Sequence, residues 1–242
     1  PEALASLLPG VQAVWDLEFE YTGPAGATAW LGEPPWGRRG WNRTSADAAV
    51  WWIDQSNQRR LTLIEWKYTE AEFGTCGGER SDNNDLKEAC TKLMGLPGDP
   101  SGHCYLTRGD TASNRRHYWE HLADAGISLD NWGSAPHCPF AGPFYQLMRL
   151  HLLARYCKLR DTYLAEADVA VICFQGDTNL WSTHRELSHL GDDVFQAWRR
   201  MLQEPESFRV VFVDDLFSGN RSSLDAVDPG WREYLSERYG VP

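Results

Sequence analysis

Two charged residues interrupt a strand-forming segment of the sequence, and their types suit phosphoester chemistry. The segment LTLIEWKYTE, residues 61–70, begins with apolar and β-branched residues and then places Glu65 and Lys67 two positions apart. Side chains two apart on a strand share one face of the sheet, and an unpaired buried charge costs roughly several kcal/mol. These two charges therefore either pair for structural reasons or act together in a site.

A third charged residue, Asp47, is expected to join them through a hairpin. The polar turn DQSNQRR joins the strand-like runs AAVWWID and LTLIEWKYT, an arrangement typical of an antiparallel pair. A turn centred near Asn57 places Asp47 opposite Lys67, since each is ten residues from Asn57 and opposed residues share a face. Asp47, Glu65 and Lys67 are thereby predicted to converge, while Trp66 faces the other side.

Two chemical interpretations of this cluster are open. In one, Lys67 forms a structural ion pair with Glu65 or Asp47. In the other, the two carboxylates bind Mg²⁺ or Mn²⁺, because carboxylate oxygens suit these ions, and the metal activates a water molecule that attacks phosphorus. Lys67 would then orient or help deprotonate that water and offset the negative charge of the phosphate.

Longer segments around these charges point to a known superfamily. The runs NRTSADAAVWW and IEWKYTE, with Glu65 placed 18 residues after Asp47, resemble the PD-(D/E)XK superfamily of restriction-endonuclease-like nucleases, with Ser-Ala in place of the Pro before the Asp. The run PFYQLMRLHLLARY is similar to prokaryotic restriction endonucleases of this superfamily. The resemblance covers residues 40–70 and 140–175, and it implies that Asp47, Glu65 and Lys67 are catalytic.

The same resemblance implies further residues and an activity. It implies Gln146 as an additional catalytic residue, and an acidic metal ligand on the first helix, for which Glu18 is the first candidate and Glu20 the second. The implied activity is Mg²⁺- or Mn²⁺-dependent endonucleolytic cleavage of DNA, or less readily of RNA, in prokaryotic defence and with a regulatory protein partner. The alternative is a catalytically silent nucleic-acid-binding or assembly domain of the same fold.

Composition limits the classes of function. The net charge of −11 over 242 residues argues against a protein that coats nucleic acid along its length, whereas basic patches such as Arg38, Arg39 and Arg43 still suit local phosphate contacts. We find no apolar run of 18 residues and no basic-plus-apolar leader. We therefore expect a cytoplasmic protein without a membrane span.

The six cysteines fall into two settings. Cys157 and Cys173 lie in apolar patterns and are predicted to be core residues. The other four lie in the loop-rich middle of the chain: Cys76, Cys90, Cys104 and Cys138. Four thiols can bind Zn²⁺ or an iron–sulfur cluster, with His103 and His137 as substitute ligands. Free buried thiols are the alternative.

The segment HYWEH, from His117 to His121, has the HxxEH pattern of an inverted zinc-peptidase motif if it lies on a helix. That chemistry needs a third ligand on a later helix, such as Glu166 or Glu186. A solvated surface helix is the competing interpretation, and the metallopeptidase is the least favoured function.

Regular elements must position these residues. Apolar residues near helical spacing predict a mostly helical segment over residues 1–20. The predicted strands and later helices are strands over 48–54, 61–69, 167–175 and 207–217, and helices over 82–94, 113–124, 142–159, 183–202 and 229–240. This alternation indicates an α/β fold with a restriction-endonuclease-like mixed central sheet flanked by helices. We expect one domain over residues 1–242, with a loop-rich insertion around 70–140.

Overall fold

A mixed five-stranded sheet forms the centre of the described part of the chain. The computed structural model describes residues 7–67, 70, 72–108, 115–176, 178–182, 187–213, 230, 233–234 and 237. The strands lie side by side in chain order: β1 (Val11–Tyr21), β2 (Ala46–Asp54), β3 (Arg59–Lys67), β4 (Leu164–Cys173) and β5 (Phe208–Phe212). The pairs β1–β2 and β2–β3 are antiparallel, and β3–β4 and β4–β5 are parallel.

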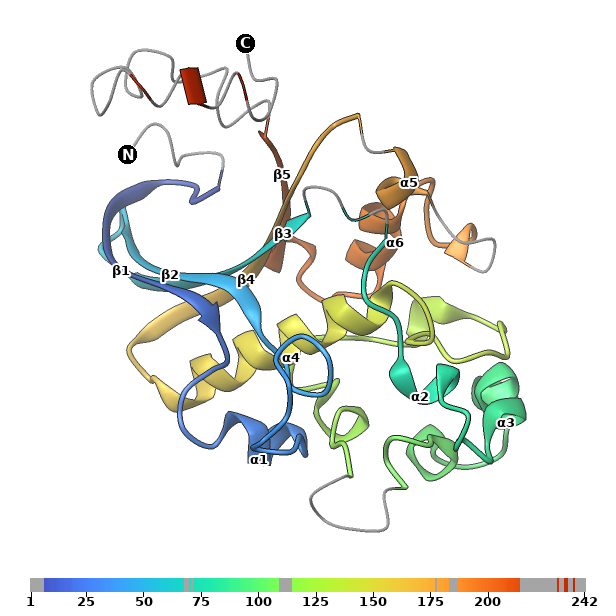
Figure 1. Ribbon diagram of the computed structural model, residues 1–242. Coiled ribbons are helices and arrows are strands. Elements are labelled where there is room, and N and C mark those ends of the chain that lie inside the picture. The colour runs from blue at the N-terminus through green and yellow to red at the C-terminus, as the bar shows by residue number, and fades with distance from the viewer. Residues whose placement is uncertain are drawn as a thin grey trace.

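Helices flank this sheet, which confirms the predicted α/β fold class. Figure 1 shows α4 (Phe144–Arg160) crossing one face of the sheet, with α1 (Ala27–Leu31) beside it. The other α-helices are α2 (Gly77–Arg80), α3 (Lys87–Lys92), α5 (Thr178–Trp181) and α6 (Val194–Arg200). Short 3-10 helices are η2 (Leu93–Gly95), η3 (Pro100–His103), η4 (Trp119–His121), η5 (Asp130–Trp132) and η7 (Pro205–Ser207).

Both faces of the central strands are apolar, as the sequence predicts. Leu61 and Leu63 belong to the larger core that includes α4. Val50, Trp52 and Ile64 belong to a second buried cluster on the opposite face. This double burial is typical of central strands covered on both sides.

The hairpin register differs from the prediction by two residues. Ile53 pairs with Arg59 and Ala48 with Ile64, so the turn is centred on residue 56 and the continued ladder sets Asp47 opposite Glu65. The Asp54 side chain makes the turn tighter than predicted, because its Oδ1 accepts hydrogen bonds from the backbone N–H groups of residues 56 and 58. A two-residue shift preserves the face, and the predicted convergence is unaffected.

The helix predicted over residues 1–20 is wrong where the structure describes it as β1, Val11–Tyr21. Apolar residues occupy every odd position from Val11 to Tyr21. This period of two suits a strand, although some of the same residues also fit helical spacing. Residues 1–6 of the predicted helix lie outside the described residues.

Other helix predictions also need correction. Over 113–124, the described residues form only the short η4, and over 82–94 they form α3 followed by η2. Of the helix predicted over 183–202, residues 183–186 lie outside the described residues. The described remainder is α-helical only in α6, where the side chain of Asp193 caps the N–H groups of Phe195 and Gln196 and starts the helix. Most of the predicted helix 229–240 lies outside the described residues.

The parallel pairing of β3 with β4 requires a long crossover. Glu65 is aligned with Val171, and Lys67 with Cys173. The connection between these strands, residues 68–163, contains α2, α3 and α4. Among the described residues, no helix is long and apolar enough to cross a membrane.

Candidate active site

The three predicted charged residues meet in one cavity at the end of β3. The cavity has a volume of about 960 Å³ and is lined by Asp47 from β2, Glu65 and Lys67 from β3, and Gln146 from α4. Trp41, from the loop that precedes β2, also lines it. The site therefore forms where a hairpin, a helix and a loop meet.

Glu65 and Lys67 form a buried ion pair. Lys67 Nζ lies 3.0 Å from Glu65 Oε1 and 3.5 Å from Glu70 Oε1, and both Glu65 and Lys67 are only 4% exposed. Burial raises the pKa of Glu65 to about 7, although Lys67 opposes the rise, and the nearby Asp47 carboxylate adds to it. One lysine does not compensate fully for a carboxylate buried this deeply.

Asp47 lies beside this pair and is less deeply buried. Its Oδ2 accepts a hydrogen bond of 2.6 Å from the backbone N–H of Trp66. Burial raises the pKa of Asp47, whereas the Trp66 N–H and Lys67 oppose the rise. A divalent cation bound between these two carboxylates would stabilise their charged forms and so offset the effect of burial.

Each carboxylate uses one oxygen in these contacts. Glu65 Oε1 contacts Lys67 and Gln146, and Asp47 Oδ2 contacts Trp66. Within the described residues, the second oxygen of each side chain has no hydrogen bond. The pair can thus offer one oxygen each to a hard cation such as Mg²⁺, which prefers oxygen ligands.

Gln146 lies in the site, near the start of α4. Its Nε2 donates a hydrogen bond of 2.5 Å to Glu65 Oε1, and its Oε1 accepts one of 2.8 Å from the backbone N–H of Gly74. These contacts orient the amide and hold the Glu65 carboxylate in place.

Of the two acids suggested on the first element, Glu20 lies closer to the site. Glu20 lines the cavity, and its charge adds to the raised pKa of Asp47. Glu18 is exposed, pairs with Ala49 across the β1–β2 ladder, and does not line the cavity. Glu20 also has a φ of 54°, a left-handed conformation that is uncommon for residues other than glycine.

A buried polar network supports the loop that carries Trp41. Arg149, one turn after Gln146 on α4, lies 3.5 Å from Glu33 and donates hydrogen bonds to Thr44 Oγ1 and to the Trp41 carbonyl. Thr44 also donates to Glu33, and Tyr118 Oη donates to Glu33 at 2.8 Å. Sequence reasoning missed this network, because its members are distant in the chain and show no motif.

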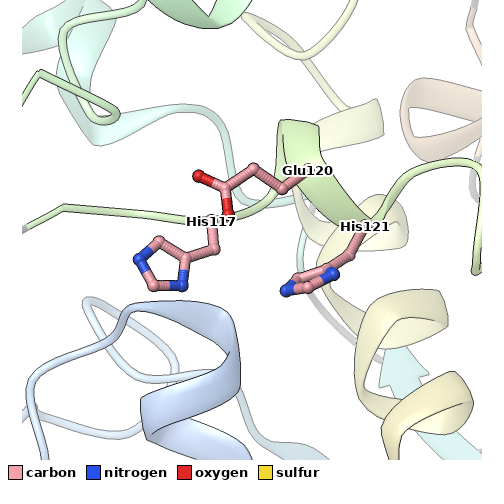
Figure 2. A group of neighbouring side chains, drawn as sticks. All are labelled: His117, Glu120 and His121. Carbon is pink, nitrogen blue, oxygen red and sulfur yellow. The ribbon is translucent and has the colours of Figure 1, made fainter.

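The HxxEH segment lies apart from this cavity. Figure 2 shows His117, Glu120 and His121 together, and their ligand-type atoms lie within 4.8 Å of one another. The segment is not α-helical, since only Trp119–His121 form a 3-10 helix. His121 stacks on Trp30, and its Nε2 lies 3.1 Å from the Trp30 carbonyl.

The third ligand that a zinc peptidase would need is not provided by Glu166. That side chain pairs with Lys158 at 2.7 Å, and Glu186 lies outside the described residues. Arg115 also lies 3.7 Å from Glu120. The group therefore has protein partners and lacks the helix on which the peptidase motif depends.

Comparison with known proteins identifies a family for this chain. A family model described as "Restriction Endonuclease associating with ARP" matches residues 1–240. Neither the curated proteins nor the solved structures give a significant match.

Proposed function

The chain belongs to the family described as Restriction Endonuclease associating with ARP, and from this premise we propose that it is a metal-dependent nuclease of the PD-(D/E)XK type. The reaction is hydrolysis of a phosphodiester bond, in DNA rather than RNA. The observation that carries the proposal is the buried Glu65–Lys67 pair, which shares a cavity with Asp47 and Gln146.

Asp47 and Glu65 would hold Mg²⁺ or Mn²⁺ through the oxygens that their protein contacts leave available. When bound, the metal would activate water and stabilise negative charge on the phosphate. Gln146 keeps the Glu65 carboxylate oriented, and the Trp66 N–H does the same for Asp47. Lys67 holds its ammonium beside the attacked phosphate, where it orients the water and offsets charge in the transition state.

The loop before β2 suits contact with the nucleic acid. Trp41 is 69% exposed and lines the cavity, and Arg39 lines it as well. The guanidinium of Arg38 lies 5.9 Å from the centre of the Trp41 ring. Exposed aromatic rings stack on unpaired bases, and arginines bind phosphates. We assign this loop to substrate binding beside the cleavage site.

The partner named in the family description, ARP, is our proposal for the regulatory protein that the chain works with. A role in prokaryotic defence and a cytoplasmic location complete the proposal. The competing function is binding of nucleic acid without cleavage.

The test is incubation of the pure chain with plasmid DNA, single-stranded DNA and RNA, in Mg²⁺, Mn²⁺ or EDTA. We expect cleavage that requires a divalent metal and that falls roughly 100-fold or more in Asp47→Asn and Glu65→Gln proteins. Glu166→Gln is the matched control, because Glu166 pairs with Lys158 outside the cavity. Metal-dependent binding of DNA without cleavage by any form, with or without ARP, would instead support the silent domain.

A further inference from the structure

Four cysteines come together beside the candidate active site, and we propose that they hold one thiolate-ligated metal centre. Cys76 directly precedes α2, Cys90 lies within α3, and Cys104 follows η3. Cys138 lies in the loop before α4. All four are free, and Cys76, Cys90 and Cys138 are buried while Cys104 is partly buried.

Backbone hydrogen bonds tie three of these segments together. The N–H of Cys138 donates to the carbonyl of Cys90 at 2.9 Å, and the N–H of Cys76 donates to the carbonyl of Ala141 at 3.2 Å. Ala141 in turn donates to the Cys138 carbonyl at 3.2 Å. The loop around Cys138 is therefore fastened both to α3 and to the start of α2.

Packing contacts place Cys104, the fourth cysteine, beside the other three segments. Asn84 Nδ2 donates to the Gly78 carbonyl at 2.8 Å and lies 3.8 Å from Cys90 Sγ. A Cβ built on Gly78 would lie 2.9 Å from the Leu106 side chain. The absence of a side chain at Gly78 thus lets the segment that follows Cys104 pack closely on α2.

Backbone and packing contacts thus hold the segments that carry the four thiols together, and three of these thiols are buried. A bound cation would stabilise four thiolates grouped in this way.

A donor atom also lies unpaired at this place. Cys90, Cys138 and His137 line a cavity of about 270 Å³. Nε2 of His137 is buried and has no hydrogen-bond partner among the described residues. A buried nitrogen without a partner is unfavourable, and a metal centre or its ligands would satisfy it.

Four thiolates suit either a zinc ion or an iron–sulfur cluster. Among the described residues, no three of these sulfurs lie within 4.8 Å of one another, so a single zinc ion with Zn–S bonds of about 2.3 Å would require them to move closer together.

The centre would also support the active site, and this step rests on the proposed function. Cys76 is two residues from Gly74, whose N–H donates to Gln146, and Gln146 donates to Glu65. Loss of the centre would release Gly74 and thereby loosen the amide that orients Glu65.

The deciding experiment is metal and sulfide analysis of the chain purified without oxygen, together with its visible absorption spectrum. We expect one centre per chain, with metal content reduced by roughly tenfold or more in Cys104→Ser and Cys138→Ser proteins. Cys157→Ser is the matched control, because Cys157 is also a buried thiol but lies in the main core, 3.6 Å from Tyr21 Oη. Iron with sulfide identifies a cluster, and one zinc per chain identifies a zinc site; each supports the centre.

Two results would overturn the proposal: wild-type protein with neither metal, or metal content that stays unchanged in all four Cys→Ser variants. Thermal melts of the Cys104→Ser protein, which alters the least buried of the four thiols, separate metal loss from misfolding. Metal content does not depend on cleavage. A metal-loaded chain that never cleaves nucleic acid would therefore refute the proposed function and leave the metal centre standing.

Discussion

At Glu65, a single carboxylate oxygen receives both Lys67 from its own strand and Gln146 from α4. A structural ion pair and a catalytic pair share this geometry, but they respond differently to mutation. Removal of one member of a structural pair changes stability, and any activity then falls only with the folded fraction. In a catalytic site the same removal changes the reaction more than the stability.

We predict that Lys67→Met protein stays folded near pH 6.5 and loses cleavage activity by roughly 100-fold or more. Burial raises the pKa of Glu65 to about 7, so that without Lys67 the carboxyl takes up a proton instead of remaining as a buried charge. Cleavage assays beside thermal melts measure the two effects. Lys158→Met is the control, since Lys158 also pairs with a glutamate. Wild-type cleavage by folded Lys67→Met protein would end the nuclease assignment for this site.

Among the helices, α4 positions the site at two points. Gln146 reaches the catalytic carboxylate, and Arg149, three residues later, reaches the loop that carries Trp41. A helix places residues three apart on one face, so a single element sets the position of both. Arg149 and Glu33 are both buried, and Arg149 Nη2 lies 3.5 Å from Glu33 Oε1.

We predict that Arg149→Met lowers the free energy of unfolding by roughly 3–5 kcal/mol, because it leaves Glu33 buried without its cation. Urea denaturation measures the loss. The double variant Glu33→Gln/Arg149→Met should lose less than the sum of the two single changes. Arg160→Met, at the exposed end of α4, is the control. Fully additive single losses would show that the two side chains are not coupled.

The elements differed in how far the sequence could predict them. The hairpin carrying Asp47, Glu65 and Lys67 followed from apolar runs and a polar turn, which are local signals. The strand β1 was missed, because its apolar residues fit helical spacing as well as alternation. Glu20 and Arg149 owe their positions to contacts across long stretches of chain, and only the folded structure reveals such contacts.

At the scale of the whole molecule, His151 makes a contribution to stability that is lost in mild acid, opposite in sign to the contribution of Glu65, whose raised pKa favours the folded state as pH falls. The His151 side chain is 4% exposed and packs against Trp198 and Phe208. Burial lowers the pKa of His151 to about 4, although its hydrogen bond to the Leu147 carbonyl opposes the shift. Between the unfolded value of 6.5 and about 4, the unfolded chain binds a proton that the folded chain does not, so the free energy of unfolding falls as pH falls.

We predict that the contribution of His151 to the free energy of unfolding falls by about 2 kcal/mol between pH 7 and pH 5. Urea denaturation of wild-type and His151→Leu proteins at both pH values isolates it, since the variant lacks this titrating group. On acidification, the free energy of unfolding of the wild-type protein should fall relative to that of the His151→Leu protein, and His189→Leu, a change at an exposed histidine, should behave like wild type. Equal losses in wild-type and His151→Leu proteins would contradict the assignment.

The parallel pairing of β3 with β4 has a consequence for the speed of folding. The two strands cannot pair until the connection of residues 68–163 has folded back and placed β4 beside β3. Such non-local pairing makes folding slow. The four cysteines proposed to bind metal all lie inside this connection. A metal centre that joins Cys76 to Cys138 would close most of this connection before the strands pair. It would thereby reduce the conformational entropy that strand pairing still has to remove. A chain that folds without metal would then keep both strands unpaired for longer. It would therefore be exposed to proteolysis for longer.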